Sequence, residues 1–297
     1  MKDYLIRVMT TNKEIRALAV NSTQVVSNAQ QAHATTPVAT AALGRALSAA
    51  LLMGSMVKTG HETGLKITGD GPLQKVIAEA NHYGAVRGYV ANPEVDLITN
   101  QAGKLDVARA IGQGELFVYK NMGLKEEYES SVPLVSGEIG EDITYYFSKS
   151  EQTPAAVALG VLVDTDCSIK AAGGFIIQLL PEASEETIEQ LEKNLAEIKS
   201  VSKLIDQGLS PEELLEKVLT GFKFRVLAER EVAYQCKCDR ERTRSLLVSL
   251  GQQEIEEIVA DEGQVEIRCH FCGEVYSFGE AEVEELFTKV KSMDELD

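Results

Sequence analysis

Four cysteines near the carboxyl end constrain this chain more than any other feature. Cys236 and Cys238 form a Cys-x-Cys pair, and after thirty intervening residues Cys269 and Cys272 form a Cys-x-x-Cys pair. Two short-range thiol pairs brought together by a fold are a common way to build a tetrahedral zinc site. Gly273 follows the second pair, where we expect a positive φ that points backbone amides at the thiolates. The sequence therefore predicts one Zn²⁺ ion held by four thiolates.

Other uses of the cysteines are less favoured. Disulfides of a secreted protein would need an export signal, and the first residues read as a charged strand pattern without an apolar signal segment. A Cys₃His site would use His270, but four thiolates need no such substitution. Cys167 stands alone in sequence, and a lone cysteine is most often a small buried hydrophobic residue, which is our prediction for it.

The charge of the chain is unevenly distributed. Residues 1–180 carry 18 acidic and 15 basic side chains, whereas residues 181–297 carry 28 and 14. A polyanionic surface repels phosphate, so the zinc site is not expected to belong to a nucleic-acid-binding finger. A length of 297 residues allows about two domains with cores of their own.

Residues 1–180 show the pattern of a mixed α and β domain. Alternating apolar residues predict strands over 4–9, 15–20, 83–90 and 115–120, and apolar spacing predicts a helix over 105–111. The apolar stretch 38–57 is long enough for a membrane span, but Arg45 and many small residues favour a helix packed inside a domain. No membrane partner is expected.

Sites for phosphate binding or catalysis are not indicated. Gly112, Gly114, Gly173 and Gly174 complete no dinucleotide or P-loop fingerprint, so we interpret them as turn and bulge glycines. The histidines of the first third, at positions 33, 61 and 82, have no nucleophile motif beside them. The sequence does not predict an enzyme.

Residues 181–231 have the pattern of two amphipathic helices. Ser184 precedes the first helix, whose apolar stripe includes Leu191, Leu195 and Ile198. The second helix begins at Ser210, where Glu213 can return the capping bond. Its apolar stripe is formed by Leu214, Leu215, Val218 and Leu219. The pattern alone favours helices that only pack on the first domain. A second interpretation is that the helices detach when they are needed and so expose their apolar stripes.

The cysteine region is small, so its fold should depend on its metal. Structural zinc in finger-sized domains contributes on the order of 10–16 kcal/mol of binding energy that is coupled to folding. Lys237, Arg240 and Arg268 flank the cysteines and, together with zinc, should keep the sulfurs as thiolates, which is the form that oxidants attack. Oxidation would destroy the ligands, although the same spacing also suits an inert zinc ribbon.

The whole chain resembles the heat-shock protein 33 family of bacterial redox-regulated chaperones. The resemblance rests on the spacing of the four cysteines behind an acidic amphipathic segment, and on two further stretches. These are Ala-Thr-Thr-Pro-Val-Ala-Thr-Ala-Ala-Leu-Gly-Arg at 34–45 and Gly-Asp-Gly-Pro-Leu at 69–73. The fold implied is α+β, with a mixed α/β amino-terminal domain at 1–180, a helical linker at 181–231 and a small zinc-binding domain at 232–297.

The resemblance implies an ATP-independent holdase that is inactive when reduced and zinc-bound. Oxidants would join Cys236 to Cys238 and Cys269 to Cys272, zinc would leave, and the zinc domain and linker would unfold. Apolar surface, including the linker residues Leu191, Leu195, Ile198, Leu214, Leu215 and Val218, would then bind unfolded client proteins. The family resemblance also implies a homodimer in the active state and a cytoplasmic location.

Two alternatives come from other functional classes. A thiol-disulfide oxidoreductase would turn over one cysteine pair, but its Cys-x-x-Cys normally lies in a thioredoxin-like βαβ context, which is absent here. A constitutive zinc-ribbon interaction module would keep its metal under peroxide and bind a fixed partner.

Overall fold

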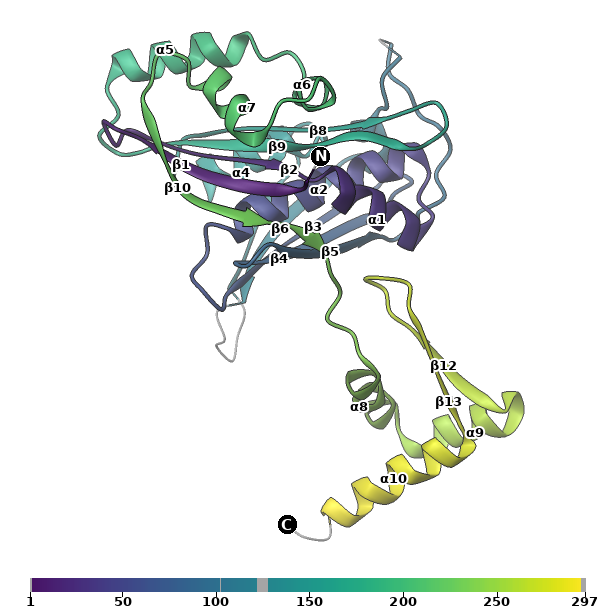
Figure 1. Ribbon diagram of the computed structural model, residues 1–297. Helices are drawn as coiled ribbons and strands as arrows, with labels where there is room; N and C mark the ends of the chain where they lie inside the picture. Colours follow the sequence, from purple (N-terminus) through teal and green to yellow (C-terminus); the bar gives the residue numbers. More distant parts are fainter. Residues whose placement is uncertain (1, 102, 122–127, 295–297) are drawn as a thin grey trace. The chain divides into compact units, whose positions relative to one another are not determined.

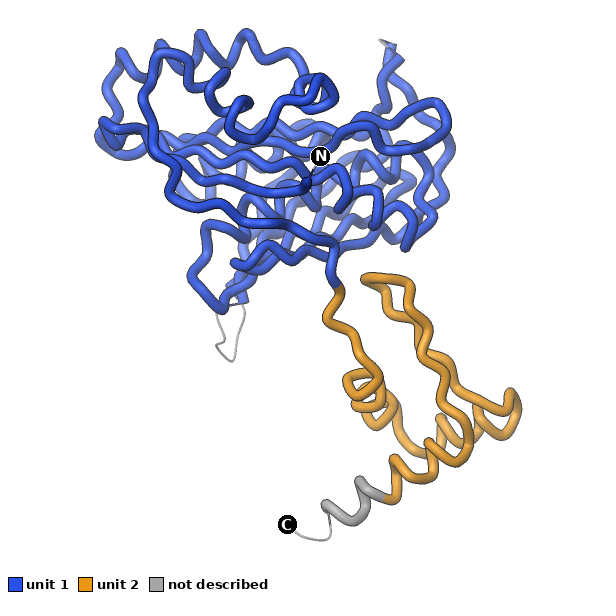
Figure 2. The backbone as a smooth tube through the Cα atoms, viewed as in Figure 1, with its two compact units in different colours: residues 1–235 blue, residues 236–297 orange. Residues whose placement is uncertain are grey.

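The chain divides into two compact units, residues 1–235 and residues 236–297 (Figure 2). The computed structural model describes residues 2–101, 103–121 and 128–294, with side chains up to residue 288. Residues 181–231 belong to the first unit together with residues 1–180. That they act as a separable linker therefore stays a prediction about function.

Unit 1 contains two sheets, one antiparallel and one antiparallel except for its edge strand β11 (Figure 1). The five-stranded sheet has the order β10-β1-β2-β9-β8 and consists of β1 (Tyr4–Thr10), β2 (Ile15–Asn21), β8 (Ala155–Val163), β9 (Ile169–Leu179) and β10 (Phe224–Glu231). The second sheet has the order β11-β5-β4-β3-β6-β7 and consists of β3 (Glu62–Gly69), β4 (Lys75–Asn81), β5 (Ala85–Val90), β6 (Gly114–Asn121), β7 (Tyr128–Pro133) and β11 (Ala233–Tyr234). Within it, only β11 runs parallel to its neighbour, β5.

The helix α2 (Pro37–Gly54) forms the centre of unit 1, because it packs against strands of both sheets. It is long and apolar enough to cross a membrane, yet 89% of it is buried inside the protein. The helix is rich in alanine and glycine because two sheets approach it closely: a Cβ atom on Gly54 would lie 3.0 Å from the Cβ of Ala80 on β4. The predicted core helix at 38–57 is confirmed.

The remaining helices of unit 1 lie around this centre. They are α1 (Thr23–His33), α3 (Val107–Ile111), α4 (Gly140–Lys149), α5 (Glu185–Ala196), α6 (Val201–Asp206) and α7 (Pro211–Val218). Helices α5, α6 and α7 cover the outer face of the five-stranded sheet (Figure 1). Successive side chains of a strand point to opposite faces of the sheet, so one sheet contributes to two cores. Leu5 faces α2, whereas Ile6 and Val8 face the α5–α7 layer.

Unit 2 is a small α+β domain with a single antiparallel hairpin. Its elements are α8 (Arg240–Leu250), α9 (Gln252–Glu262), β12 (Gln264–Arg268), β13 (Val275–Gly279) and α10 (Glu280–Asp294). Seven buried side chains form its described core: Leu247, Ile255, Val259, Val265, Phe278, Val283 and Phe287. A core of this size is small for independent stability.

Two sequence predictions about single residues are wrong. Cys167 is exposed, not buried, because it lies with a positive φ in the tight turn between β8 and β9, where its amide donates to Asp164. Gly173 and Gly174 lie inside β9 instead of in a turn or at a bulge. A Cβ atom on Gly173 would lie 2.2 Å from the Val20 carbonyl oxygen, so close strand and helix packing requires the glycine. Gly112 does end a helix with positive φ, as predicted for a turn glycine.

Candidate metal centre and the docked linker helices

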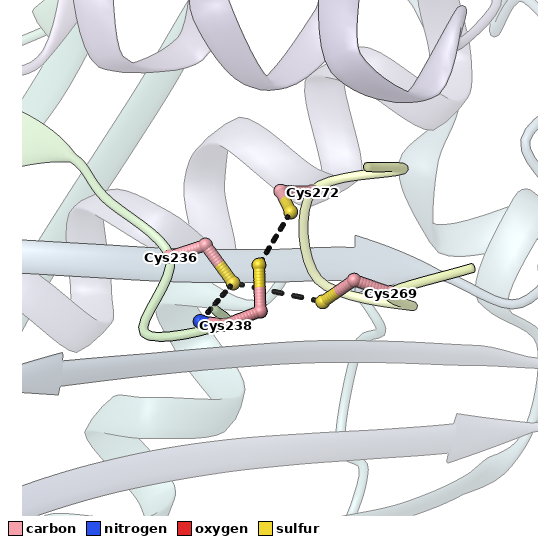
Figure 3. A group of neighbouring side chains, drawn as sticks. All are labelled: Cys236, Cys238, Cys269 and Cys272. Carbon is pink, nitrogen blue, oxygen red and sulfur yellow. Dashed lines mark hydrogen bonds between the residues drawn. The ribbon is translucent and has the colours of Figure 1, made fainter. Parts of the chain in front are cut away.

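Four thiols converge in unit 2 from two separate turns (Figure 3). Cys236 and Cys238 lie directly before α8, whose amino terminus is capped by Asp239 through a hydrogen bond from the Arg242 amide. Cys269 and Cys272 lie in the connection between β12 and β13. The hairpin and the helix cap thus bring together two pairs that are thirty residues apart in the sequence.

The spacing of the sulfurs suits one tetrahedral zinc ion. All four Sγ atoms lie within 4.8 Å of one another. The Cys236 and Cys269 sulfurs are 3.6 Å apart, and those of Cys238 and Cys272 are 3.3 Å apart. Zinc–sulfur bonds of about 2.3 Å in a tetrahedron place the sulfurs about 3.8 Å from each other. The group does not include His270, so the four-thiol site fits without it.

The backbone around the second pair is fixed by its own hydrogen bonds. Gly273 has φ +74°, as predicted, but its amide donates to the Cys269 carbonyl at 2.8 Å and not to a sulfur. The Cys269 amide in turn donates to the Glu274 carbonyl. The expected glycine turn is therefore present, and it shapes the loop without contacting the thiols directly.

Hydrogen-bond donors from other groups do reach the sulfurs. The Cys238 amide lies 3.5 Å from the Cys236 sulfur, and the Tyr276 hydroxyl donates to the Cys238 sulfur at 3.3 Å. The bond to Cys238 raises the pKa of Tyr276, which keeps the hydroxyl protonated and able to donate. The sequence analysis did not identify Tyr276 as a contact of the cysteines. The signal that could have indicated it is its position in a strand, four residues after Cys272.

The thiols differ in acidity. Burial raises the pKa of Cys272 and of Cys238, and sulfur neighbours, Cys236 and Cys269, add to the effect. Burial acts in the same direction on Cys236, but hydrogen bonds from Cys238 and from the other thiols outweigh it and lower the pKa to about 7. Four negative charges in so small a volume need a cation, and Zn²⁺ would supply the charge that keeps all four sulfurs deprotonated.

The basic side chains beside the cysteines stabilise unit 2 itself. Arg240 donates to Glu282 and to the Ser277 carbonyl, both at 2.8 Å, and its guanidinium lies 4.4 Å from the centre of the Phe278 ring. The Arg268 Nε donates to the Gly273 carbonyl at 3.2 Å. These contacts hold the chain around the thiols, and the predicted role of the same charges in stabilising thiolates stays a prediction.

The apolar linker residues singled out from the sequence are docked on the sheet. Leu191, Leu214, Leu215 and Val218 are buried and Leu195 and Ile198 are partly buried, all in one core with the outer face of the five-stranded sheet. That core also contains Ile6 on β1 and Phe175 on β9. The predicted packing of the helices on the first domain is confirmed, and so are the caps at Ser184 and Ser210.

Polar contacts fix the same helices at their ends. Asn194 on α5 donates to the carbonyls of Val218 and Thr220 at 2.9 and 2.8 Å, and so satisfies carbonyl groups at the end of α7. Thr187 on α5 donates to Glu14, which lies between β1 and β2. The sequence pattern gave no sign of these side chains, because their partners are distant in the chain.

Comparison with known proteins agrees with this architecture. The family described as Hsp33 protein matches residues 3–279. The 33 kDa chaperonin of Geobacillus kaustophilus is 49% identical over 287 residues, which cover 96% of this chain and 98% of that protein. The 33 kDa chaperonin of Bacillus mycoides is 47% identical over 291 residues, covering 98% and 100%. The crystal structure of the 33 kDa chaperonin (heat shock protein 33 homolog) from Thermotoga maritima has a TM-score of 0.92 and 40% identity, and the match covers 98% of this chain and 100% of that one.

Fold, thiol site and relatives together define a chaperone that is controlled by a cysteine–zinc centre. The chain belongs to the Hsp33 family. It is a redox-regulated holdase and not an enzyme, and its carboxyl-terminal unit carries the four-cysteine site for one zinc ion.

Proposed function

We propose that the reduced, zinc-bound protein is held inactive by the docked helices α5–α7, and that oxidation of the four cysteines releases them. In this proposal Cys236 pairs with Cys238 and Cys269 pairs with Cys272. Unit 2 then loses its fold, and residues 181–231 leave the sheet to expose apolar surface. The observation that carries the proposal is that the clustered thiols and the buried apolar stripes lie in one chain, joined through β10 and β11.

The chemistry of the switch is balanced with peroxide as the oxidant. One thiolate of a pair attacks peroxide and becomes a sulfenic acid, and one hydroxide leaves. The second thiolate attacks the sulfenic sulfur, so that the disulfide forms and another hydroxide leaves. Each disulfide takes two electrons from the two sulfurs and reduces one peroxide to two waters once the hydroxides are protonated. Both pairs together consume all four metal ligands.

The path from the thiols to the linker follows the backbone. The Gln235 amide donates to the Val86 carbonyl at 2.8 Å, and the Ala233 amide donates to the Gly84 carbonyl at 3.0 Å. Directly before this, β10 forms an edge of the five-stranded sheet through its pairing with β1. Edge strands are held on one side only, so loss of structure at Cys236 can spread through β11 and β10 toward α7.

We infer that the released surface binds unfolded clients through the residues that are now buried against the sheet. Leu191 and Leu195 lie on the sheet-facing side of α5 and Leu214, Leu215 and Val218 on that of α7, whereas Ile198 lies in the connection after α5. The exposed faces of these helices are rich in glutamate. An apolar stripe flanked by charge can cover apolar client segments while the complex stays in solution. We further propose that the active form is a homodimer and acts in the cytoplasm, as the family resemblance implies.

Mapping the disulfides of the active protein tests this function. The protein is treated with peroxide at elevated temperature, its free thiols are blocked, and peptides are analysed by mass spectrometry. The proposal requires Cys236–Cys238 and Cys269–Cys272 bridges to appear together with suppression of client aggregation. Bridges between the two pairs, or active protein with four free thiols, would overturn it. Insulin reduction measured in parallel separates a holdase from an oxidoreductase, because only the latter turns over.

A further inference from the structure

A cavity of about 180 Å³ opens at the carboxyl-terminal end of α2, within unit 1. One side is formed by Arg16 on β2 and Gln178 on β9. Lys120 on β6 contributes from the second sheet, and Glu151, its ion-pair partner, also lines the cavity. Met53, Met56 and Phe147 supply apolar walls. A cavity of about 150 Å³ is large enough for benzene, so this one has room for a ring with a small polar group.

The Arg16 guanidinium has hydrogen-bonding capacity that its contacts within the protein do not use. Its Nε and Nη2 atoms both donate to the Gln178 side-chain oxygen, at 3.0 and 2.5 Å. Gln178 is only 2% exposed, so this contact fixes the plane of the guanidinium. In the part of the chain that the structure describes, Nη1 of Arg16 has no hydrogen-bond partner. A rigid guanidinium with donors to spare is the usual receptor for a carboxylate.

The surroundings of the cavity carry excess positive charge. Register places Arg230 opposite Leu5 and Arg16 opposite Met9, so both share the face of β1 that also carries Arg7. Among the described residues, these three arginines form no ion pair. The buried Nε of Arg7 has no hydrogen-bond partner either.

Negative groups compensate this charge only partly. Glu151 accepts hydrogen bonds from Lys120 at 2.7 Å and from Tyr146 at 2.6 Å. The carboxyl end of α2 adds about half a negative charge, and Arg7 contacts it through the Ser55 carbonyl at 3.3 Å. Burial, followed by repulsion from Arg7, lowers the pKa of Arg16, and an anion beside the guanidinium would oppose both effects.

We propose that this cavity binds a small organic carboxylate, whose oxygens accept hydrogen bonds from Arg16 and Lys120 and whose apolar body contacts Met53, Met56 and Phe147. Polar side chains, Thr63 and Thr153 among them, line much of the cavity, so the apolar contacts of a ligand are confined to the side formed by the methionines and Phe147. Methionine side chains adapt to varied shapes, so the pocket suits aromatic and branched aliphatic acids of this size.

Calorimetric titration of the reduced, zinc-loaded full-length protein with benzoate tests the proposal. Benzoate should bind saturably at one site, and benzamide, which has the same shape without the charge, should bind about tenfold more weakly or worse. The variants Arg16→Gln and Lys120→Gln should each weaken benzoate binding by at least about tenfold. Arg109→Gln removes an exposed arginine of α3 that does not line the cavity, and should leave the titration unchanged.

Three results would overturn the proposal: no saturable heat with benzoate, equal binding of benzamide, or unchanged benzoate binding in both cavity variants. Zinc content and the unfolding temperature are measured for every variant. If Arg16→Gln does not fold, Lys120→Gln decides the outcome, because Lys120 lies near the end of β6 and its side chain is only partly buried.

Discussion

The hydroxyl of Tyr4 on β1 donates a hydrogen bond to the carboxylate of Glu212 in the first turn of α7. Burial, followed by this bond, raises the pKa of Tyr4 to about 12. The contact lies beside the apolar core that joins α7 to the sheet, so a polar bond reinforces apolar docking. Sheet and linker are thus held together by side chains that are 208 positions apart in the chain.

Replacing Tyr4 with phenylalanine should loosen α7 without opening a cavity. Loss of a hydrogen bond to a charged partner costs about 1.5–3 kcal/mol at most, and less here because the site is partly exposed. We expect faster hydrogen exchange of the α7 amides in the reduced protein. Tyr83→Phe is the matched control, since Tyr83 is 63% exposed. Equal exchange in both variants would show that the Tyr4 bond does not hold the helix.

Shortening Leu215 should activate the reduced protein. This side chain is fully buried between α7 and the sheet, and removal of such a leucine costs about 2–5 kcal/mol. We expect Leu215→Ala to suppress aggregation of a thermally unfolding client before any oxidation, while it keeps its zinc. Glu216→Ala, a change at the neighbouring exposed position, should stay inactive. Docking would not be the inhibitory contact if Leu215→Ala bound no client in the reduced state.

Zinc affinity should rise with pH. Burial and neighbouring sulfurs raise the pKa of Cys238 and Cys272, so these thiols hold protons near neutral pH that zinc must displace. Cys236, with a pKa of about 7, is mostly protonated only below that pH, so zinc displaces a proton from it mainly there. Calorimetry in buffers of different ionisation enthalpy should show more protons released per zinc at pH 6 than at pH 8. A constant proton count across this range would contradict the assignment.

Serine substitution should separate the switch cysteines from Cys167. Cys238→Ser removes a sulfur that contacts both Cys272 and Tyr276, so zinc content should fall and unit 2 should lose protection. Cys167→Ser changes an exposed turn residue and should retain zinc and oxidative activation. Retention of one zinc per chain in Cys238→Ser would argue against a four-thiolate site. Loss of activation in Cys167→Ser would add a fifth cysteine to the mechanism.

Sequence reasoning succeeded where the signal is local. Helix caps at Ser184 and Ser210 depend on residues a few positions apart, and both predictions are confirmed. Within each cysteine pair the spacing is equally short, and the structure places the sulfurs of the two pairs together. The long apolar helix was also recognised, because Arg45 and small residues distinguish it from a membrane span. Such features need no knowledge of tertiary contacts.

Contacts between distant residues could not be anticipated. Strand β10 lies within a segment that the sequence analysis assigned to the linker, and only its pairing with β1 makes it part of the sheet. Tyr276 was missed because its bond to Cys238, 38 positions away, depends on how the fold brings the β12–β13 hairpin to the segment before α8. Cys167 was placed in a core because average burial ignores the turn that Asp164 and Ser168 form around it.

Simultaneous recording of zinc release and chaperone activity during oxidation tests the central claim most directly. The reduced protein is treated with peroxide at elevated temperature in the presence of a zinc-binding dye, and samples are assayed for suppression of client aggregation. Our account predicts that one zinc per chain is released and that activity rises with the same time course. Full activity with zinc retained, or complete zinc release without activity, would contradict it.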